Sequence, residues 1–474
     1  MDDKSPTDGM ASSSSNSQGL SIEEHVESLV VSHPAEVRDD SGDIDPSIPI
    51  PDSGLDPQDD TSEVIIQQND PNSPLFSVKT FDQLGLKDEL LQGIYGMKFN
   101  KPSRIQEASL PLILANPPRN LVAQAHNGSG KTACFVLGML SRVDVNVRSP
   151  QALCVAPTRE LARQIMEVAQ RMGKYTKITY FLAVKDSNMD IAELKRLRVE
   201  EHVVIGTPGK IKGFIEHRNL NPRAIKMFVL DEADEMLDKQ GFQDECIRIK
   251  RILPPAVQCL FFSATFPERV QKFAMQMVTE PNIISVKREQ LSIEGIKQLW
   301  MECGGPGGAD NRFQILSDIY ALLTIGQSII FVNRRETAQD LTRRMREAEH
   351  TVSVLHGADM STSERDRVID EFRTGKTKVL LTTNVLSRGI DISQVSLVIN
   401  YDMPFNKFGR ADPETYLHRI GRTGRFGRKG VAINLVFDDA SRKCLREIIT
   451  TYLKEITEIK PENIEELEKM IRDR

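Results

Sequence analysis

Two successive series of short apolar runs constrain the fold of this chain more than any other feature. Polar stretches of helical period separate the runs, which are the right length for buried strands. Alternating buried strands and helices are typical of parallel α/β sheets, so we predict two doubly wound α/β domains in tandem. The runs are 120–125, 152–157, 202–206, 227–234 and 259–265, followed by 327–333, 351–356, 378–384, 395–402 and 431–437.

The composition divides the chain into four segments. Residues 1–70 are rich in Asp, Ser and Pro and hold too little apolar surface to offset chain entropy, so we predict a disordered acidic tail. We place the first α/β domain at 71–287, a polar linker at 288–296 and the second domain at 297–474. A length of 474 residues agrees with this division, because a domain has about 150 residues.

The charge of the chain is distributed unevenly. Residues 1–70 hold 17 acidic residues against Lys4 and Arg38, a net charge of −15, while the whole chain carries −6. Residues 71–474 therefore carry +9. This split allows a body that binds a polyanion, and it equally allows an ordinary enzyme with a solubilising tail.

The sequence shows no sign of export or membrane insertion. No run of 18 apolar residues occurs, and the N-terminus lacks the basic and apolar regions of a secretory signal. We expect reduced and mostly buried thiols in an intracellular protein, since no C-x-x-C pair is present. The cysteines are Cys134, Cys154, Cys246, Cys259, Cys303 and Cys444.

The segment AHNGSGKT lies between a predicted strand and an apolar helix. In this context it is typical of a phosphate-binding loop, although Ala125 stands where the general pattern has glycine. Backbone amides would cradle phosphates, Lys131 would reach the β- and γ-phosphates, and the Thr132 hydroxyl would ligate Mg²⁺. A chance glycine-rich turn is the alternative, which the flanking elements disfavour. The loop comprises Ala125, His126, Asn127, Gly128, Ser129, Gly130, Lys131 and Thr132.

A second cluster, MFVLDEAD, ends an apolar run at residue 234. Asp231 is expected to hold Mg²⁺, partly through water, and Glu232 to orient the attacking water. The carboxyl ends of parallel strands form one ligand crevice, so this cluster and the phosphate loop should meet there. The alternative for the cluster alone is a solvated helix cap.

These two elements resemble those of the DEAD-box RNA helicases, which are named after residues like 231–234. The phosphate loop of that family normally begins with alanine, as here. On nine motifs in family order the chain is identified as a member, which implies two RecA-like doubly wound parallel-sheet domains. The other motifs are KPSRIQ (101–106), PTRELARQ (157–164), TPGK (207–210), SAT (263–265), IIFVN (329–333), TTNVLSRGID (382–391) and HRIGRTGR (418–425).

The resemblance implies further residues of an ATP site. Gln106 would read the adenine edge, and Phe99 would stack on the base unless it is a core residue. Arg422 and Arg425 resemble arginine fingers, whose planar charge suits a γ-phosphate in the transition state. Asp391 is a further implied nucleotide contact. Coupling between the domains is implied for Ser263, Thr265, His418 and Arg419.

RNA contacts are implied at a second rim of the domains. Hydroxyls, amides and guanidiniums that face phosphates give sequence-independent binding. The low aromatic content, 6%, fits this, because sequence-specific readers usually stack bases on aromatic side chains. The implied contacts are Pro157, Thr158, Arg159, Thr207, Gly209, Asn333, Arg373 and Thr383.

The expected activity is RNA-stimulated ATP hydrolysis that locally unwinds RNA or remodels RNA–protein complexes. ATP and RNA should both favour the closed pair of domains and therefore bind cooperatively. The alternative is an ATP-gated RNA clamp with little turnover, although Glu232 and both finger positions are intact. A small-molecule kinase would leave the second domain unexplained, and a DNA helicase is disfavoured only by the resemblance.

Some stretches resemble the messenger-RNA-export branch of the family, plant members in particular. They are DPNSPLFSVKTF (70–81), the long link before HRIGR (403–422) and TTNVLSRGID. This branch implies a monomer in cytoplasm and nucleus, enriched at the cytoplasmic face of the nuclear pore. Its implied partners are RNA, a cytoplasmic-filament nucleoporin and an activator bound to inositol hexakisphosphate. The chain departs from the family in having AVKDSN at 183–188 and a lysine at position 210.

The charge split motivates a prediction about the tail. If the tail competes electrostatically for the basic body, deleting residues 1–70 should tighten RNA binding at low salt. Fluorescence anisotropy with a labelled single-stranded RNA measures this at several salt concentrations. Equal affinities of the full-length and truncated proteins would contradict the hypothesis.

Overall fold

The computed structural model describes most of the chain from residue 78 onward. Statements about structure concern the described residues, which include Gly295 and Ile296 of the predicted linker and residues 64–67 of the predicted tail. The described ranges are 64–67, 78–125, 128–185, 196–238, 241–286, 295–305, 309–322, 326–356, 360–384, 395–406, 408–424, 430–452, 455–463 and residue 467.

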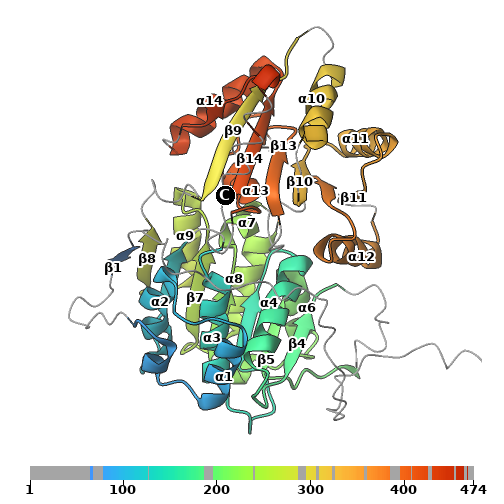
Figure 1. Ribbon diagram of the computed structural model, residues 1–474. Coiled ribbons are helices and arrows are strands. Elements are labelled where there is room, and N and C mark those ends of the chain that lie inside the picture. Colours follow the sequence, from blue (N-terminus) through green and yellow to red (C-terminus); the bar gives the residue numbers. More distant parts are fainter. Residues whose placement is uncertain are drawn as a thin grey trace, which may run out of the picture. The chain divides into compact units, whose positions relative to one another are not determined.

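The first domain is built on an eight-stranded sheet (Figure 1). Its strands, in spatial order, are β1 (Val64–Gln67), β8 (Asn282–Val286), β2 (Leu121–Gln124), β7 (Gln258–Ser263), β6 (Met227–Leu230), β3 (Ala152–Val155), β5 (Val203–Gly206) and β4 (Tyr180–Ala183). All neighbours are parallel except β1, which is antiparallel to β8. The helices are α1 (Asp88–Gly96), α2 (Arg104–Leu114), α3 (Lys131–Arg142), α4 (Arg159–Met172), α6 (Pro208–Glu216), α7 (Ala233–Asp238), α8 (Phe242–Ile252) and α9 (Glu268–Met277), with short 3-10 turns at Phe81–Leu84 and Pro222–Ala224.

Helices cover both faces of this sheet. Successive side chains of β2 alternate, so Leu121 and Ala123 pack with α1–α4 while Val122 packs with α6, α8 and α9. Burial on both faces explains why the strands are continuous apolar runs. In a strand with one solvent-exposed face, apolar and polar residues would alternate along the sequence.

The second domain repeats the design with a seven-stranded parallel sheet. Its strands, in spatial order, are β11 (Val352–Leu355), β12 (Val379–Thr382), β10 (Gln327–Phe331), β13 (Val395–Asn400), β14 (Gly430–Val436), β9 (Ile296–Glu302) and β15 (Thr457–Glu458). The helices are α10 (Ala309–Leu322), α11 (Arg335–Glu347), α12 (Thr362–Arg373), α13 (Pro413–Ile420) and α14 (Asp439–Tyr452), and a 3-10 turn follows at Pro461–Asn463. Helices α10 and α11 pack on one face, and α12, α13 and α14 on the other.

The strand order places the predicted motifs at adjacent strand ends. The phosphate loop, SAT, DEAD, PTRE and TPG motifs follow β2, β7, β6, β3 and β5, which are consecutive neighbours in the first sheet. Because carboxyl ends of parallel strands meet at one edge, the fold gathers these motifs without any long loop.

The two predicted α/β domains are confirmed, and each apolar run contains a strand. The prediction of disorder was wrong at residues 64–67, because the apolar run there forms β1 and pairs with β8. Among the strands outside the predicted runs, β4 and β15 lie at sheet edges, where partly or fully exposed side chains weaken the apolar signal. A tail deletion should therefore end before β1.

Two further expectations bear on the described residues. All six cysteines are buried, as predicted. Among the described helices, none combines the length and apolar character that crossing a membrane requires.

Two helix glycines allow a test of packing. A Cβ on Gly93 of α1 would lie 1.8 Å from the backbone oxygen of Met172, whereas one on Gly213 of α6 meets nothing within 4 Å. We expect Gly93→Ala to lower the free energy of unfolding by about 1–3 kcal/mol through overpacking. Gly213→Ala should raise it by up to about 1 kcal/mol, since alanine favours helix. Urea unfolding followed by circular dichroism measures both, and equal effects would contradict the packing described here.

Candidate functional site

The phosphate loop joins β2 to α3 through glycines in the left-handed region. Gly128 and Gly130 have φ values of 83° and 97°. A Cβ on Gly130 would lie 2.6 Å from Gln106 Nε2, so this position requires glycine for both backbone and space. Ala125 N donates to Ser263 O at 3.1 Å, and Lys131 Nζ donates to Ala125 O at 2.7 Å. His126 and Asn127 lie outside the described residues.

Gln106 holds the loop from the side. Its Oε1 accepts from Ser103 N and its Nε2 donates to Gly130 O, both at 3.0 Å, while Ser103 Oγ donates to Ser129 O at 2.7 Å. The predicted adenine-reading amide is thus fixed against the loop, and adenine reading stays a prediction. Phe99 is partly buried against the core of the first domain, so both of its interpretations stay open.

Buried charges surround the loop. Lys131, Asp231 and Glu232 are 6%, 2% and 5% exposed. Burial lowers the pKa of Lys131, and the nearby Asp231 and Glu232 charges act in the opposite direction. Burial raises the pKa of both carboxyls above their ordinary values, and Lys131 opposes this for both. The geometry therefore brings the predicted phosphate-binding and catalytic groups together in one place with little access to water.

Glu232 has an unusual backbone conformation. Its φ is 46°, in the left-handed region that non-glycine residues rarely adopt, and its N–H donates to Asp231 Oδ1 at 3.0 Å. Glu232 Oε2 is buried and has no hydrogen-bond partner among the described residues. Such strain and an unsatisfied oxygen are typical of functional sites, because surrounding structure must stabilise them.

One carboxylate connects three motifs. Asp234 Oδ2 accepts from Thr265 Oγ1 at 2.8 Å and lies 3.1 Å from His418 Nε2. Ser263 Oγ donates to Thr265 O at 2.7 Å. The predicted couplers Thr265 and His418 therefore meet at Asp234, a residue outside the predicted set, and Ser263 is joined to them through Thr265. The position of Asp234 three residues after Asp231, on the first turn of α7, was the available signal.

Arg422 follows α13 and extends this connection. Its Nε donates to His418 O at 3.1 Å, and its side chain is 3% exposed. Its charge lowers the pKa of Glu232, although desolvation dominates that carboxyl. Arg422 is therefore close enough for its charge to act on Glu232, and its role as an arginine finger stays a prediction. Arg425 and Asp391 lie outside the described residues, and their roles stay predictions.

The predicted RNA residues of the first domain lie at two helix N-termini. Thr158 is the N-cap of α4 and accepts from Leu161 N at 3.1 Å, and Thr207 is the N-cap of α6. Pro157 directly precedes Thr158, and Gly209 lies in the first turn of α6. Helix N-termini present free amides and partial positive charge, which suits phosphate oxygens.

Both predicted RNA-contact arginines are paired with carboxylates. Arg159 Nη2 lies 2.6 Å from Asp366 Oδ2, and Arg373 Nη1 lies 3.1 Å from Glu167 Oε1. Each guanidinium would have to exchange its partner for an RNA phosphate, so these contacts stay predictions.

In the second domain, Asn333 follows β10 and Thr383 follows β12, which are adjacent strands. Arg419 lies between them and is fully buried. Its hydrogen bonds to described residues all end inside the second domain: Asn333, Asn384, Asn400 and the Asp402 carbonyl. Arg419 thus joins segments of one domain, and its predicted role between domains stays a prediction.

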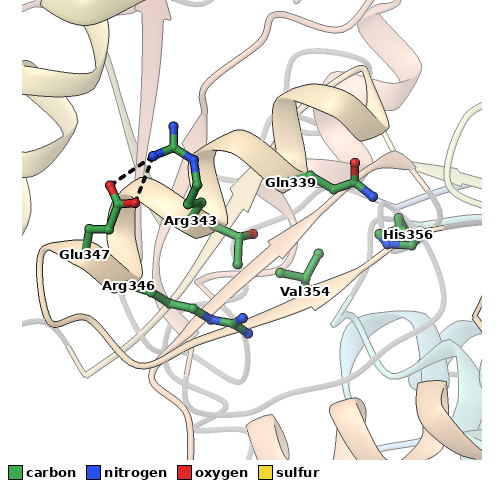
Figure 2. Close-up of a pocket in the computed structure, with 7 residues that line it drawn as sticks. Gln339, Arg343, Arg346, Glu347, Val354 and His356 are labelled. Carbon is green, nitrogen blue, oxygen red and sulfur yellow. Dashed lines mark hydrogen bonds and ion pairs between the residues drawn. The ribbon is translucent and has the colours of Figure 1, made fainter.

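A surface cavity of about 610 Å³ lies elsewhere, between α11 and β11. Figure 2 shows Arg343 turned toward Glu347, with which it forms an ion pair at 2.8 Å, and Val354 and His356 on the opposite wall. None of the predicted site residues lines this cavity, so it does not mark the ATP site.

The oxygen donors next to the loop fit a metal ion that also binds phosphate. No group of three or more His, Cys, Asp or Glu side chains in the described parts of the chain is arranged to hold a metal by itself. Mg²⁺ usually takes one or two protein carboxylates plus water and substrate phosphates, so a complete protein cage is not required.

Comparison with known proteins assigns the class. Residues 103–273 match the DEAD/DEAH box helicase family, and residues 311–427 match the helicase conserved C-terminal domain. The chain therefore belongs to the DEAD/DEAH box helicases.

Close relatives narrow the assignment within this class. The chain is 53% identical over 406 residues to the ATP-dependent RNA helicase dbp5 of Schizosaccharomyces pombe, which covers 86% of this chain and 79% of the relative. Identity to DBP5 of Mycosarcoma maydis is 51% over 408 residues, with 86% and 87% covered. This chain therefore belongs to the Dbp5 ATP-dependent RNA helicases.

Solved structures agree with this assignment. Dbp5 of S. cerevisiae bound to RNA and ADP BeF3 matches with a TM-score of 0.79 and 50% identity, over 84% of this chain and 99% of that one. A variant of the same protein bound to a Gle1 variant and IP6 gives a TM-score of 0.72 and 49% identity, with the same coverage.

Gln106 provides a test of the loop geometry. We expect Gln106→Met to raise the KM for ATP about tenfold, because both amide contacts that hold Ser103 and Gly130 are lost. Steady-state phosphate release at varied ATP measures the change. Gln271→Met is the control, since the exposed amide of this α9 residue donates to Phe266 O, just before the helix, and not to a residue of the loop. An unchanged KM in Gln106→Met would contradict the role.

Proposed function

We propose that this chain uses RNA-stimulated ATP hydrolysis to separate short RNA duplexes and remove proteins from RNA during messenger-RNA export. The observation that carries this proposal is the Asp234 carboxylate, which joins Thr265 to His418. Through it, the strand end that bears Glu232 is connected to the helix whose end bears Arg422. An RNA that favours closure of the domains would thereby complete the ATP site.

The proposed ATP site uses groups from both domains. Lys131 binds the β- and γ-phosphates, Gln106 contacts adenine, and Glu232 accepts a proton from the attacking water. Arg422, and by resemblance Arg425, stabilises negative charge on the γ-phosphate in the transition state. Burial of Lys131, Gln106, Glu232 and Arg422 supports the assignment, because electrostatic stabilisation is stronger where water is excluded.

We further propose Mg²⁺ as the metal that accompanies ATP. The Thr132 hydroxyl and the Asp231 carboxylate are hard oxygen donors beside the phosphate loop, as Mg²⁺ prefers. When bound, Mg²⁺ would neutralise phosphate charge. Asp231 and Glu232 are both buried, and Glu232 Oε2 has no hydrogen-bond partner among the described residues, which supports a cation at this place.

The proposed RNA path follows the strand ends next to the ATP site. In the first domain it uses the N-termini of α4 and α6, and in the second domain Asn333 and Thr383. Contacts to phosphates from amides, hydroxyls and guanidiniums make binding independent of base sequence. RNA bound to S. cerevisiae Dbp5, which matches this chain closely, supports the ligand class.

Partners and location are proposed from the same relatives. Solved structures contain S. cerevisiae Dbp5 variants with Gle1 and IP6, and with Nup159 as well. We propose that this chain likewise binds a cytoplasmic-filament nucleoporin and an IP6-bound activator. It would then act at the cytoplasmic face of the nuclear pore while also occurring in cytoplasm and nucleus.

The decisive experiment is steady-state ATP hydrolysis with and without single-stranded RNA. We expect RNA to stimulate the wild-type protein, and Glu232→Gln to lose hydrolysis by about 100-fold or more while retaining ATP-dependent RNA binding. Glu280→Gln is a matched control, because Glu280 has the same φ of 46° but lies on the surface.

The outcomes separate the two functions considered. Hydrolysis that RNA does not stimulate would contradict the proposal. ATP-dependent RNA retention without turnover, even with the IP6-bound activator added, would favour the clamp instead.

A further inference from the structure

Asp402 lies just after β13, outside the motifs that the sequence singled out. Its side chain is 16% exposed, and one carboxylate oxygen accepts from Arg312 Nη2 on α10. The other oxygen accepts from Asn333 N at 2.8 Å. A single carboxylate thus connects the far helix α10 to the residue that begins the proposed RNA path in this domain.

Arg312 is a fixed partner for this carboxylate. Its guanidinium carbon lies 3.5 Å from the centroid of the Tyr401 ring and 4.3 Å from that of Phe437. Its side chain is 6% exposed. Stacking between two rings and burial restrict the guanidinium to one place, and a buried charge pair tolerates little change in geometry.

The backbone of Asp402 extends the same network. Its carbonyl accepts from Arg419 Nη1 at 2.6 Å, and Arg419 Nη2 donates to Asn333 Oδ1 at 2.9 Å. Arg419 also contacts Asn384 beside Thr383. Both RNA-proposed loops of the second domain therefore form hydrogen bonds with the buried Arg419 of α13.

The same network bears on the ATP site through α13. Arg419 is one residue after His418, which contacts Asp234, and three residues before Arg422. A shift of Asp402 that moves Arg419 would therefore move Asn333 and the two ATP-site residues together.

We propose that Asp402, held by Arg312, is a positioning residue. It fixes the second-domain loops that are proposed to contact RNA in position relative to α13. This inference deepens the proposed function and rests on it. It assigns Asp402 no contact with ATP or RNA. Its effect passes through Asn333 N–H and Arg419.

Asp402→Asn tests the proposal in the full-length protein. An amide has one oxygen, so it cannot accept from both Arg312 and Asn333, and its NH₂ must face one donor. We expect the concentration of single-stranded RNA that gives half-maximal ATPase stimulation to rise about tenfold, and kcat at saturating RNA to fall. The Kd of a fluorescent ATP analogue without RNA should stay unchanged, because the phosphate loop is untouched.

A double variant separates positioning from charge neutralisation. In Arg312→Met/Asp402→Asn the buried cation is removed, so Tm should recover toward the wild-type value. If Asp402 positions Asn333, the RNA requirement, meaning the concentration of single-stranded RNA that gives half-maximal ATPase stimulation, stays raised in the double variant. A wild-type RNA requirement in the double variant would mean that Asp402 only neutralises Arg312, and would overturn the inference.

Leu341→Ala provides the structural control. Leu341 lies on α11, is 2% exposed, packs in the core of the second domain and takes no part in the network. It should lower Tm and leave the RNA requirement unchanged, while an equal rise would overturn the inference. RNA stimulation absent from the wild type would overturn the proposed function instead, so the two failures are distinguishable.

Discussion

The proposed ATP site depends on buried charges of opposite sign that have little contact with water. The ammonium of Lys131 stands among buried carboxylates, and each sign lowers the cost of burying the other. This attraction ties the phosphate loop after β2 to the strand end of β6, although β7 lies between them in the sheet. Lys131 Nζ donates to the loop carbonyl of Ala125, and phosphates would replace that acceptor. The site is therefore shaped for an anion before one arrives.

The first domain could be predicted well because its chemistry is local in sequence. A strand, a tight loop and a helix follow one another in the chain. The residues next to 125–132 are therefore enough to predict that this segment is a loop between a strand and a helix. The fold confirms that context, with Gly130 at the N-terminus of α3. What the sequence could not show is that Gln106 and Ser103 from α2 complete the loop. That contact depends on how α2 packs, and no periodic pattern reports it.

The second domain was harder to predict because its key contacts join distant polar residues. Asn333, Asn384, Asp402 and Arg419 belong to four different segments and meet only when parallel strands bring their ends together. Single asparagines and aspartates after strands are common at turns, so each has an ordinary explanation alone. The hydrogen bonds that join them around the buried Arg419 are visible only in the fold. The same reason explains why Asp234 was overlooked, since its partners Thr265 and His418 are remote in sequence.

Helix α13 carries both the hydrogen bonds of Arg419 and the contact of His418 with Asp234. Tyr416 and Arg419 are three residues apart and face inward: the Tyr416 hydroxyl contacts Gln298, and Arg419 contacts Asn400. His418 contacts Asp234 from a different side of the same helix. A helical period of 3.6 residues separates these two directions without any extra element. One short helix is thus held on its inner side by Gln298 and Asn400 and contacts Asp234 on another side, so its position links these two sets of contacts.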